Sequence, residues 1–214
     1  FPPSARVTLD GNEQYDDLAT LAALLARLAE TPRGARLVER IALIEQPIAR
    51  RDSFDESRLT GIDALPAPVI IDEADAGLEA LPRAIAAGYR GISVKNCKGV
   101  FRALVNAARC AQTPGVFQSA EDLSNLPILA LQQDLATVAV LGLDHVERNG
   151  HHYFRGLDHL DEAVVEAALD VHGDLYARTP DGAALRIDEG AIAIASLDRP
   201  GYGYDARLFA GAAV

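Results

Sequence analysis

The sequence predicts an α/β protein that forms part of a (β/α) barrel, because apolar strand-like runs alternate with helical patterns along most of the chain. Strands separated by helices imply right-handed crossovers and a parallel sheet. Polar residues stand at the C-terminal end of each run, where the active sites of barrels collect. An open doubly wound sheet would gather them at one switch point instead, so their distribution favours the barrel.

Six strands are predicted, at residues 6–12, 41–46, 68–72, 91–96, 116–121 and 145–148. The first helix begins after Asp16 and Asp17, whose negative charges suit a helix N-terminus, and the segment 31–34 is expected to end it. Further helices are predicted at residues 78–87, 100–112 and 127–141, and the connection 52–65 is polar and only weakly helical. The sequence therefore predicts about six strand-helix units, which is too few to close an eight-stranded barrel.

The C-terminal part follows another pattern. Asn149-Gly150 is a two-residue hairpin signal between the segments 145–148 and 151–154. A helix is expected at residues 161–169, with short β-like runs after it. We therefore predict a partial barrel over residues 1–159 and a β-containing C-terminal segment over residues 160–214.

Composition limits the choice of compartment and partners. The 214 residues carry 49% hydrophobic residues, enough for a sizeable core, and a net charge of −11, which argues against a nucleic-acid partner. We see no stretch that would span a membrane and expect no membrane partner. The two cysteines, Cys97 and Cys110, are too few for a disulfide framework and indicate the cytoplasm, and Cys97 is expected to be a small packed residue.

Acidic residues at the ends of successive strands indicate a cation site. Because side chains alternate along a strand, Asp10, Glu45, Asp72, Lys95 and Glu121 can all point into one barrel mouth. Carboxylates are costly to bury unpaired, so Asp10, Glu45 and Asp72 at the ends of three apolar strands suggest that a cation binds among them. A hard divalent ion is the simplest candidate.

Several assignments stay open at this point. Glu73 is the alternative to Asp72, although the register favours Asp72. Lys95 faces inward, either for a chemical purpose or in a salt bridge to Glu121 or Asp72. The other candidates for contacts with substrate or with the ligating groups are Asn12, Lys98, Ser119 and Glu121. Of these, Asn12 is expected to hydrogen-bond a ligating carboxylate, and Lys98 either reaches the site or sits on the first helical turn.

Four segments in this order resemble the barrel domain of the enolase superfamily, closest to its mandelate racemase and muconate-lactonizing branches. The segments are Leu9-Asp10-Gly11-Asn12-Glu13, Ile44-Glu45-Gln46-Pro47, Ile71-Asp72-Glu73-Ala74-Asp75 and Val94-Lys95-Asn96-Cys97-Lys98-Gly99. The resemblance covers roughly residues 6–148. It implies that Asp10, Glu45 and Asp72 bind Mg²⁺, with Mn²⁺ as the alternative, and that Lys95 is the catalytic base. The histidine of the mandelate type is not evident in the segment 117–122, which favours a lysine-based site.

The resemblance also implies an activity and partners. We expect an isomerase or lyase that abstracts the α-proton of a small carboxylate substrate through a metal-stabilised enediolate, as a racemase, epimerase, cycloisomerase or dehydratase. The alternative is a catalytically silent barrel module for ligand binding or assembly. The family has an N-terminal capping domain and two earlier barrel strands, which we expect to lie outside these 214 residues. The segment 160–214 is expected to pack against that cap, in a homo-oligomer.

Overall fold

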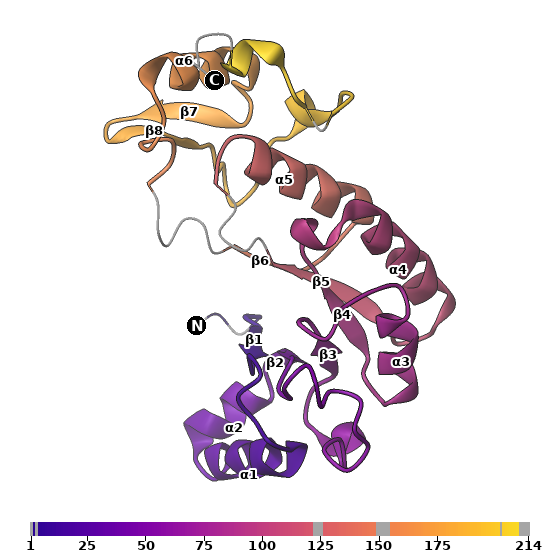
Figure 1. Cartoon of the computed structure of the whole chain (residues 1–214). Helices are drawn as coiled ribbons and strands as arrows, with labels where there is room; N and C mark the ends of the chain where they lie inside the picture. The colour runs from indigo at the N-terminus through magenta and orange to yellow at the C-terminus, as the bar shows by residue number, and fades with distance from the viewer. Residues whose placement is uncertain (1, 3, 122–125, 149–154, 202, 210–214) are drawn as a thin grey trace. The chain divides into compact units, whose positions relative to one another are not determined.

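The computed structural model describes residues 2, 4–121, 126–148, 155–201 and 203–209 (Figure 1). One six-stranded sheet has its strands in the order in which they follow along the chain. The pairings of β1 with β2, β2 with β3, β3 with β4 and β5 with β6 are all parallel. The strands are β1 (Val7–Asp10), β2 (Ile41–Glu45), β3 (Val69–Ile71), β4 (Gly91–Val94), β5 (Phe117–Glu121) and β6 (Val146–Glu147). This confirms the predicted incomplete (β/α) barrel.

Helices connect most of the strands, and the connection between β2 and β3 contains the short turn η1 (Ile62–Ala64), in line with the polar and weakly helical segment that the sequence predicts there. The helices are α1 (Leu18–Ala29), α2 (Pro32–Val38), α3 (Ala80–Ala86), α4 (Val100–Gln112) and α5 (Leu129–Leu141), followed by α6 (Glu162–Val171). Asp17 caps α1 by accepting the backbone N–H of Thr20, which agrees with the predicted acidic N-terminus. The sequence analysis missed α2, because it took the segment 31–34 as a terminator alone. Thr31 in fact caps α2 through the N–H of Gly34, and Pro32 takes the first helical position, where proline is tolerated.

The chain divides into two compact units. The first comprises Phe1–Val94 and Phe101–Ser119, and the second comprises Lys95–Val100 and Ala120–Val214. The predicted domain boundary at residue 160 does not coincide with the boundary between these two units, and it stays a prediction. Cys97, in the short turn η2 (Asn96–Lys98) of the second unit, is exposed rather than packed, because the strand β4 ends before it, at Val94.

The core of the first unit lies between the sheet and its helices. Leu18, Leu21 and Leu25 of α1 belong to one buried cluster with Ile44 and Ile71 of the strands. Glu45 and Asp72 directly follow these two isoleucines, so strand alternation turns them to the opposite face. The first unit thereby presents acidic groups on the face that its apolar core does not occupy.

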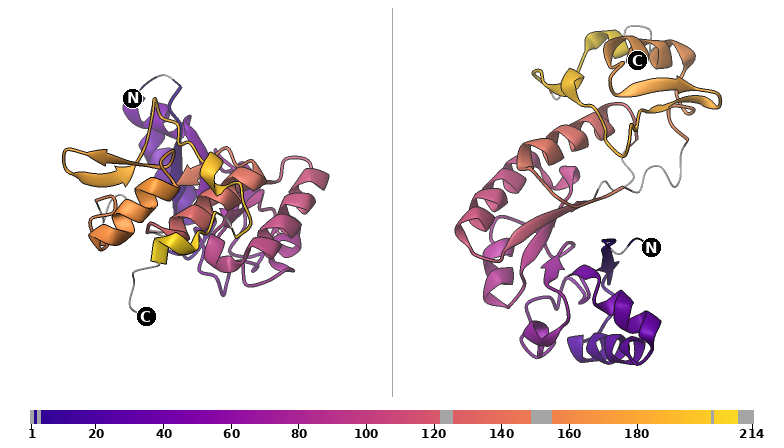
Figure 2. Two further views of the ribbon diagram at one scale, coloured as in Figure 1. Left: turned by 90° about the horizontal axis from the view of Figure 1, so that it is seen from above. Right: turned by 180° about the vertical axis from the view of Figure 1, so that it is seen from behind.

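The second unit contains the β-containing tail that the sequence predicts. The strands β7 (Tyr176–Thr179) and β8 (Gly182–Leu185) form an antiparallel hairpin that lies beside α6 (Figure 2). The short turns η4 (Ala195–Leu197) and η5 (Ala206–Phe209) follow. The hairpin predicted around Asn149 lies outside the described residues. Within the described part of the chain, every helix is too short or too polar to cross a lipid bilayer.

Candidate active site

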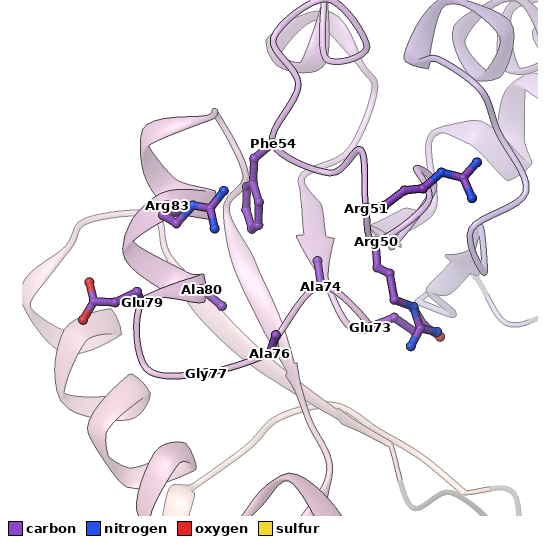
Figure 3. Close-up of a pocket in the computed structure, with 10 residues that line it drawn as sticks. All are labelled: Arg50, Arg51, Phe54, Glu73, Ala74, Ala76, Gly77, Glu79, Ala80 and Arg83. Atoms are coloured by element: carbon purple, nitrogen blue, oxygen red, sulfur yellow. The ribbon is translucent and has the colours of Figure 1, made fainter.

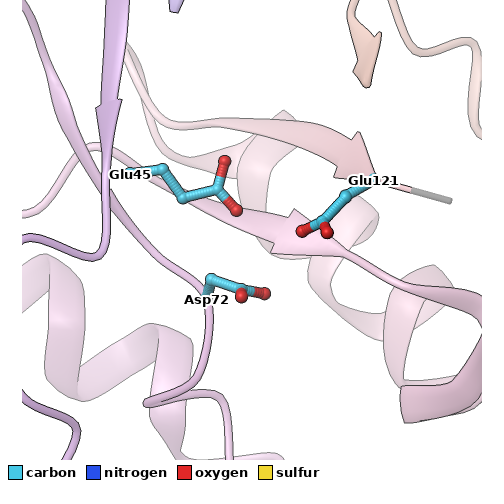
Figure 4. A group of neighbouring side chains, drawn as sticks. All are labelled: Glu45, Asp72 and Glu121. Atoms are coloured by element: carbon cyan, nitrogen blue, oxygen red, sulfur yellow. The ribbon is translucent and has the colours of Figure 1, made fainter. Parts of the chain in front are cut away.

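Glu45 and Asp72 bring two carboxylates together at the carboxyl edge of the sheet. Glu45 is the last residue of β2 and Asp72 comes directly after β3. One carboxylate oxygen of Glu45 lies within 4.8 Å of one of Asp72. Both residues are buried, with 5% and 2% of their surface exposed. Figure 4 shows their side chains. A close pair of buried carboxylates is a geometry that suits a divalent cation.

Asp10 lies at the same edge but is exposed. It ends β1 and pairs in register with Glu45. Its carboxylate accepts the backbone N–H of Asn12 at 2.8 Å and the side-chain amide of Asn12 at 3.2 Å. Asn12 has a φ of +41°, so the backbone turns back after the strand and brings the amide to Asp10. Asn12 thus makes the hydrogen bond to Asp10 that the sequence led us to expect.

A salt bridge between Arg50 and Glu13 ties the loops after β1 and β2 together. Arg50 donates to Glu13 through Nη2 at 2.6 Å and through Nε at 3.0 Å, and its backbone N–H donates to the same carboxylate at 2.6 Å. The Arg50 guanidinium holds the pKa of the Glu13 carboxyl below its usual value. The sequence analysis gave neither residue a role, since nothing in the local pattern links two residues 37 positions apart.

Glu73, the alternative to Asp72, lines a pocket of about 330 Å³ in the first unit (Figure 3). The pocket lies between the loop after β2 and the start of α3, and Arg83 of α3 lies over the ring of Phe54, 4.2 Å from its centroid. The remaining lining residues are Arg50, Arg51, Ala74, Ala76, Gly77, Glu79 and Ala80. Glu45 and Asp72 do not line this pocket. The neighbouring residues Asp72 and Glu73 therefore lie in different environments.

Lys95 and Glu121 form an ion pair in the second unit. The Nζ atom of Lys95 lies 2.7 Å from Oε2 of Glu121, and the two side chains are 9% and 15% exposed. Lys95 directly follows β4, and Glu121 is the last residue of β5. The salt bridge that the sequence analysis kept as an alternative for Lys95 is therefore present. Figure 4 also labels Glu121.

The remaining predicted residues are less informative. Ser119 is buried within β5. Lys98 is partly buried and ends η2, so it precedes α4 rather than lying on its first turn. Because the carboxyl ends of neighbouring parallel strands share one edge of a sheet, Asp10, Glu45 and Asp72 lie along one edge within the first unit.

No family model and no curated protein matches the chain. Solved structures do match it. A mandelate racemase/muconate lactonizing enzyme from Sorangium cellulosum is 26% identical with a TM-score of 0.54, over 68% of this chain and 38% of that one. A mandelate racemase/muconate lactonizing enzyme from Roseiflexus sp. is 28% identical with a TM-score of 0.52, over 68% of this chain and 40% of that one. This chain resembles the mandelate racemase/muconate lactonizing enzyme family. Its likeness to the L-Ala-D/L-Glu epimerase from Bacillus subtilis concerns the fold alone, at 15% identity and a TM-score of 0.56, over 85% of this chain and 45% of that one.

The chain matches only a part of each mandelate racemase/muconate lactonizing enzyme. The chain spans about two fifths of the length of the family members that it matches, 38% and 40% for the two enzymes above. The activity and substrate of a whole family member are therefore matters for proposal.

Proposed function

We propose that the chain is the barrel part of a divalent-metal-dependent enzyme that removes the α-proton of a carboxylate substrate. The observation that carries the proposal is the pair of buried carboxylates, Glu45 and Asp72, within 4.8 Å of one another. The likeness to mandelate racemase/muconate lactonizing enzymes supports it. The reaction is that of a racemase, epimerase, cycloisomerase or dehydratase.

Electrostatics explains why these two side chains suit a cation. Two negative charges within 4.8 Å of one another repel by at least about 3 kcal/mol at an effective dielectric constant of about 20. A Mg²⁺ or Mn²⁺ ion between them would convert this repulsion into attraction, and both ions accept carboxylate oxygens. We propose Asp10 as the third ligand, held by Asn12. When bound, the ion would supply positive charge to the substrate carboxylate as negative charge develops there.

Lys95 is the proposed base. A base must be able to lose its own proton, which an arginine cannot do near neutral pH. Lys95 and Lys98 are the only two lysines of the sequence, against 18 arginines. Lys95 is the more deeply buried, and Glu121 holds its Nζ at 2.7 Å. Glu121 would orient the amine and stabilise the ammonium group that forms when Lys95 takes the proton.

Calorimetric titration of the protein with Mg²⁺ and with Mn²⁺ tests the metal site. We expect the wild-type protein to bind the ion. The Glu45→Gln and Asp72→Asn variants should bind it at least about 100-fold more weakly, because each change removes a ligand of the ion. Glu73→Gln is the matched control, since Glu73 is the next carboxylate along the chain and lines the pocket beside Arg50 and Phe54; it should bind as the wild type does. Absence of binding in the wild type, or equal binding in all variants, would favour a catalytically silent module.

A further inference from the structure

The side chain of Gln46 connects the two loops that carry Glu45 and Asp72. Gln46 directly follows Glu45 and is wholly buried. Its Oε1 atom accepts the backbone N–H of Asp72 at 2.8 Å and that of Ala74 at 3.1 Å. Its Nε2 atom donates to the carbonyl of Ile48 at 2.7 Å and to Oγ of Ser53 at 2.8 Å. The donor half of the amide thus holds the loop after β2, and the acceptor half holds the loop after β3.

These four bonds use the full capacity of the amide. A glutamine side chain has two N–H donors and one oxygen with two lone pairs, and each of the four has a partner here. Turning the amide over would bring N–H against N–H at Asp72 and oxygen against oxygen at Ile48. One orientation alone satisfies the site, so the group is fixed in place.

The backbone of Gln46 is fixed as well. Its N–H donates to the carbonyl of Ile70 at 2.9 Å, and its own carbonyl accepts the N–H of Glu13 at 2.8 Å. Its φ of +32° lies in the left-handed region, which residues with a Cβ seldom adopt. The chain therefore turns sharply right after Glu45, and this turn brings the amide to the N–H of Asp72.

We propose that Gln46 is a positioning residue that sets the distance between the carboxylates of Glu45 and Asp72, and thereby the affinity for a divalent cation. The inference rests on the proposed function. Gln46 itself does not touch the ion: it acts through the backbone N–H of Asp72, while its own backbone continues that of Glu45. Outer-sphere groups that orient metal ligands typically change metal affinity 10- to 100-fold when they are removed.

Mg²⁺ titrations of three variants separate the two halves of the amide. Gln46→Met keeps the length of the side chain but loses all four bonds, and we expect it to bind Mg²⁺ about 10- to 100-fold more weakly. Gln46→Glu keeps an oxygen for the N–H groups of Asp72 and Ala74 but places a second oxygen against the carbonyl of Ile48, so it should lower the stability and still bind Mg²⁺ no more weakly than the wild type. Ser53→Ala removes one partner of the donor half, so it should lower the stability while the Mg²⁺ affinity stays within about twofold of the wild type.

Hydrogen exchange provides a readout that does not depend on the metal. The backbone N–H groups of Asp72 and Ala74 should lose protection in Gln46→Met and keep it in Ser53→Ala. If Gln46→Met does not fold, Gln46→Asn replaces it, since it keeps the amide but is one methylene too short to bridge the loops.

The outcomes distinguish this inference from the proposed function. If the wild type binds no divalent cation, the proposed function fails, whatever the exchange data show. If the wild type binds Mg²⁺ and the folded Gln46→Met or Gln46→Asn variant binds it equally well, Gln46 is not a positioning residue and the proposed function stands. Weaker binding in Gln46→Glu would also overturn the inference, because it would place the effect in the wrong half of the amide.

Discussion

At the residue scale, the ion pair of Lys95 and Glu121 serves stability as well as the proposed chemistry. Both side chains are largely buried and 2.7 Å apart. Removing one member of a buried ion pair typically costs about 3–5 kcal/mol, because the remaining charge loses that counter-charge in a site with little water. Activity measurements on Lys95 variants must therefore be accompanied by unfolding measurements on the same samples.

His172 is a further buried titratable residue, remote in sequence from the proposed site. It follows α6 and is wholly buried, and its Nδ1 atom lies 2.9 Å from Oγ of Ser196. Burial and the nearby positive charge of Arg199 lower the pKa of His172 below its usual value. The folded protein thus favours the neutral ring, and the unfolded chain binds the proton more readily.

This pKa shift predicts the pH dependence of stability. Stability due to the neutral His172 is complete above the unfolded-state pKa of about 6.5 and is lost as the pH falls toward the lower folded-state pKa. We expect the free energy of unfolding to decrease between pH 7 and pH 5, and to decrease less in His172→Asn, which cannot titrate. Urea unfolding at several pH values measures both slopes, and equal slopes would contradict the assignment.

At the element scale, the approach of β1 to β2 depends on a residue without a side chain. The N–H of Gly11 donates to the carbonyl of Glu45 at 2.7 Å. A Cβ atom at Gly11 would lie 2.6 Å from Cα of Pro47, which is part of the backbone and cannot rotate away. Glycine therefore allows the loop that follows Asp10 to lie against the loop that follows Glu45.

Gly11→Ala should accordingly destabilise the protein by about 1–3 kcal/mol, because the two loops must move apart. Gly77→Ala is the matched control, since a Cβ there meets no atom within 4 Å, and it should be no less stable than the wild type. Urea unfolding of both variants compares the two. Equal stability of Gly11→Ala and the wild type would show that the loops tolerate the added methyl group.

The elements differ in how far the sequence predicts them. The strands and α4 could be predicted from apolar runs and turn residues, because each element buries one face and its apolar residues therefore recur at a regular spacing. The helix α2 was missed, because Thr31 and Pro32 suit a helix start as well as a helix end. Alternation predicted which face carries Glu45 and Asp72. The contact of Gln46 with Asp72 could not be predicted, because it joins residues 26 positions apart through a buried side chain.

At the scale of the whole molecule, the sheet order has a functional consequence. Because the strands follow one another in chain order, short local motifs at successive strand ends become neighbours along one edge. The chain matches about two fifths of the length of mandelate racemase/muconate lactonizing enzymes. The capping domain, the earlier strands and the homo-oligomer that the resemblance implies stay predictions, as does the cytoplasmic location.

Exchange of the α-hydrogen with solvent deuterium tests the central claim most directly. The protein is incubated in D₂O with Mg²⁺ and a panel of small carboxylates that carry an α-hydrogen, and the loss of that proton signal is followed by NMR. We expect the wild type to exchange at least one of them, and Lys95→Ala and Lys95→Arg to be slower by at least about 100-fold with Mg²⁺ affinity near that of the wild type. Lys98→Ala should keep the activity. Exchange at the wild-type rate in folded Lys95→Ala, or no exchange by the wild type of any member of the panel, would contradict the account.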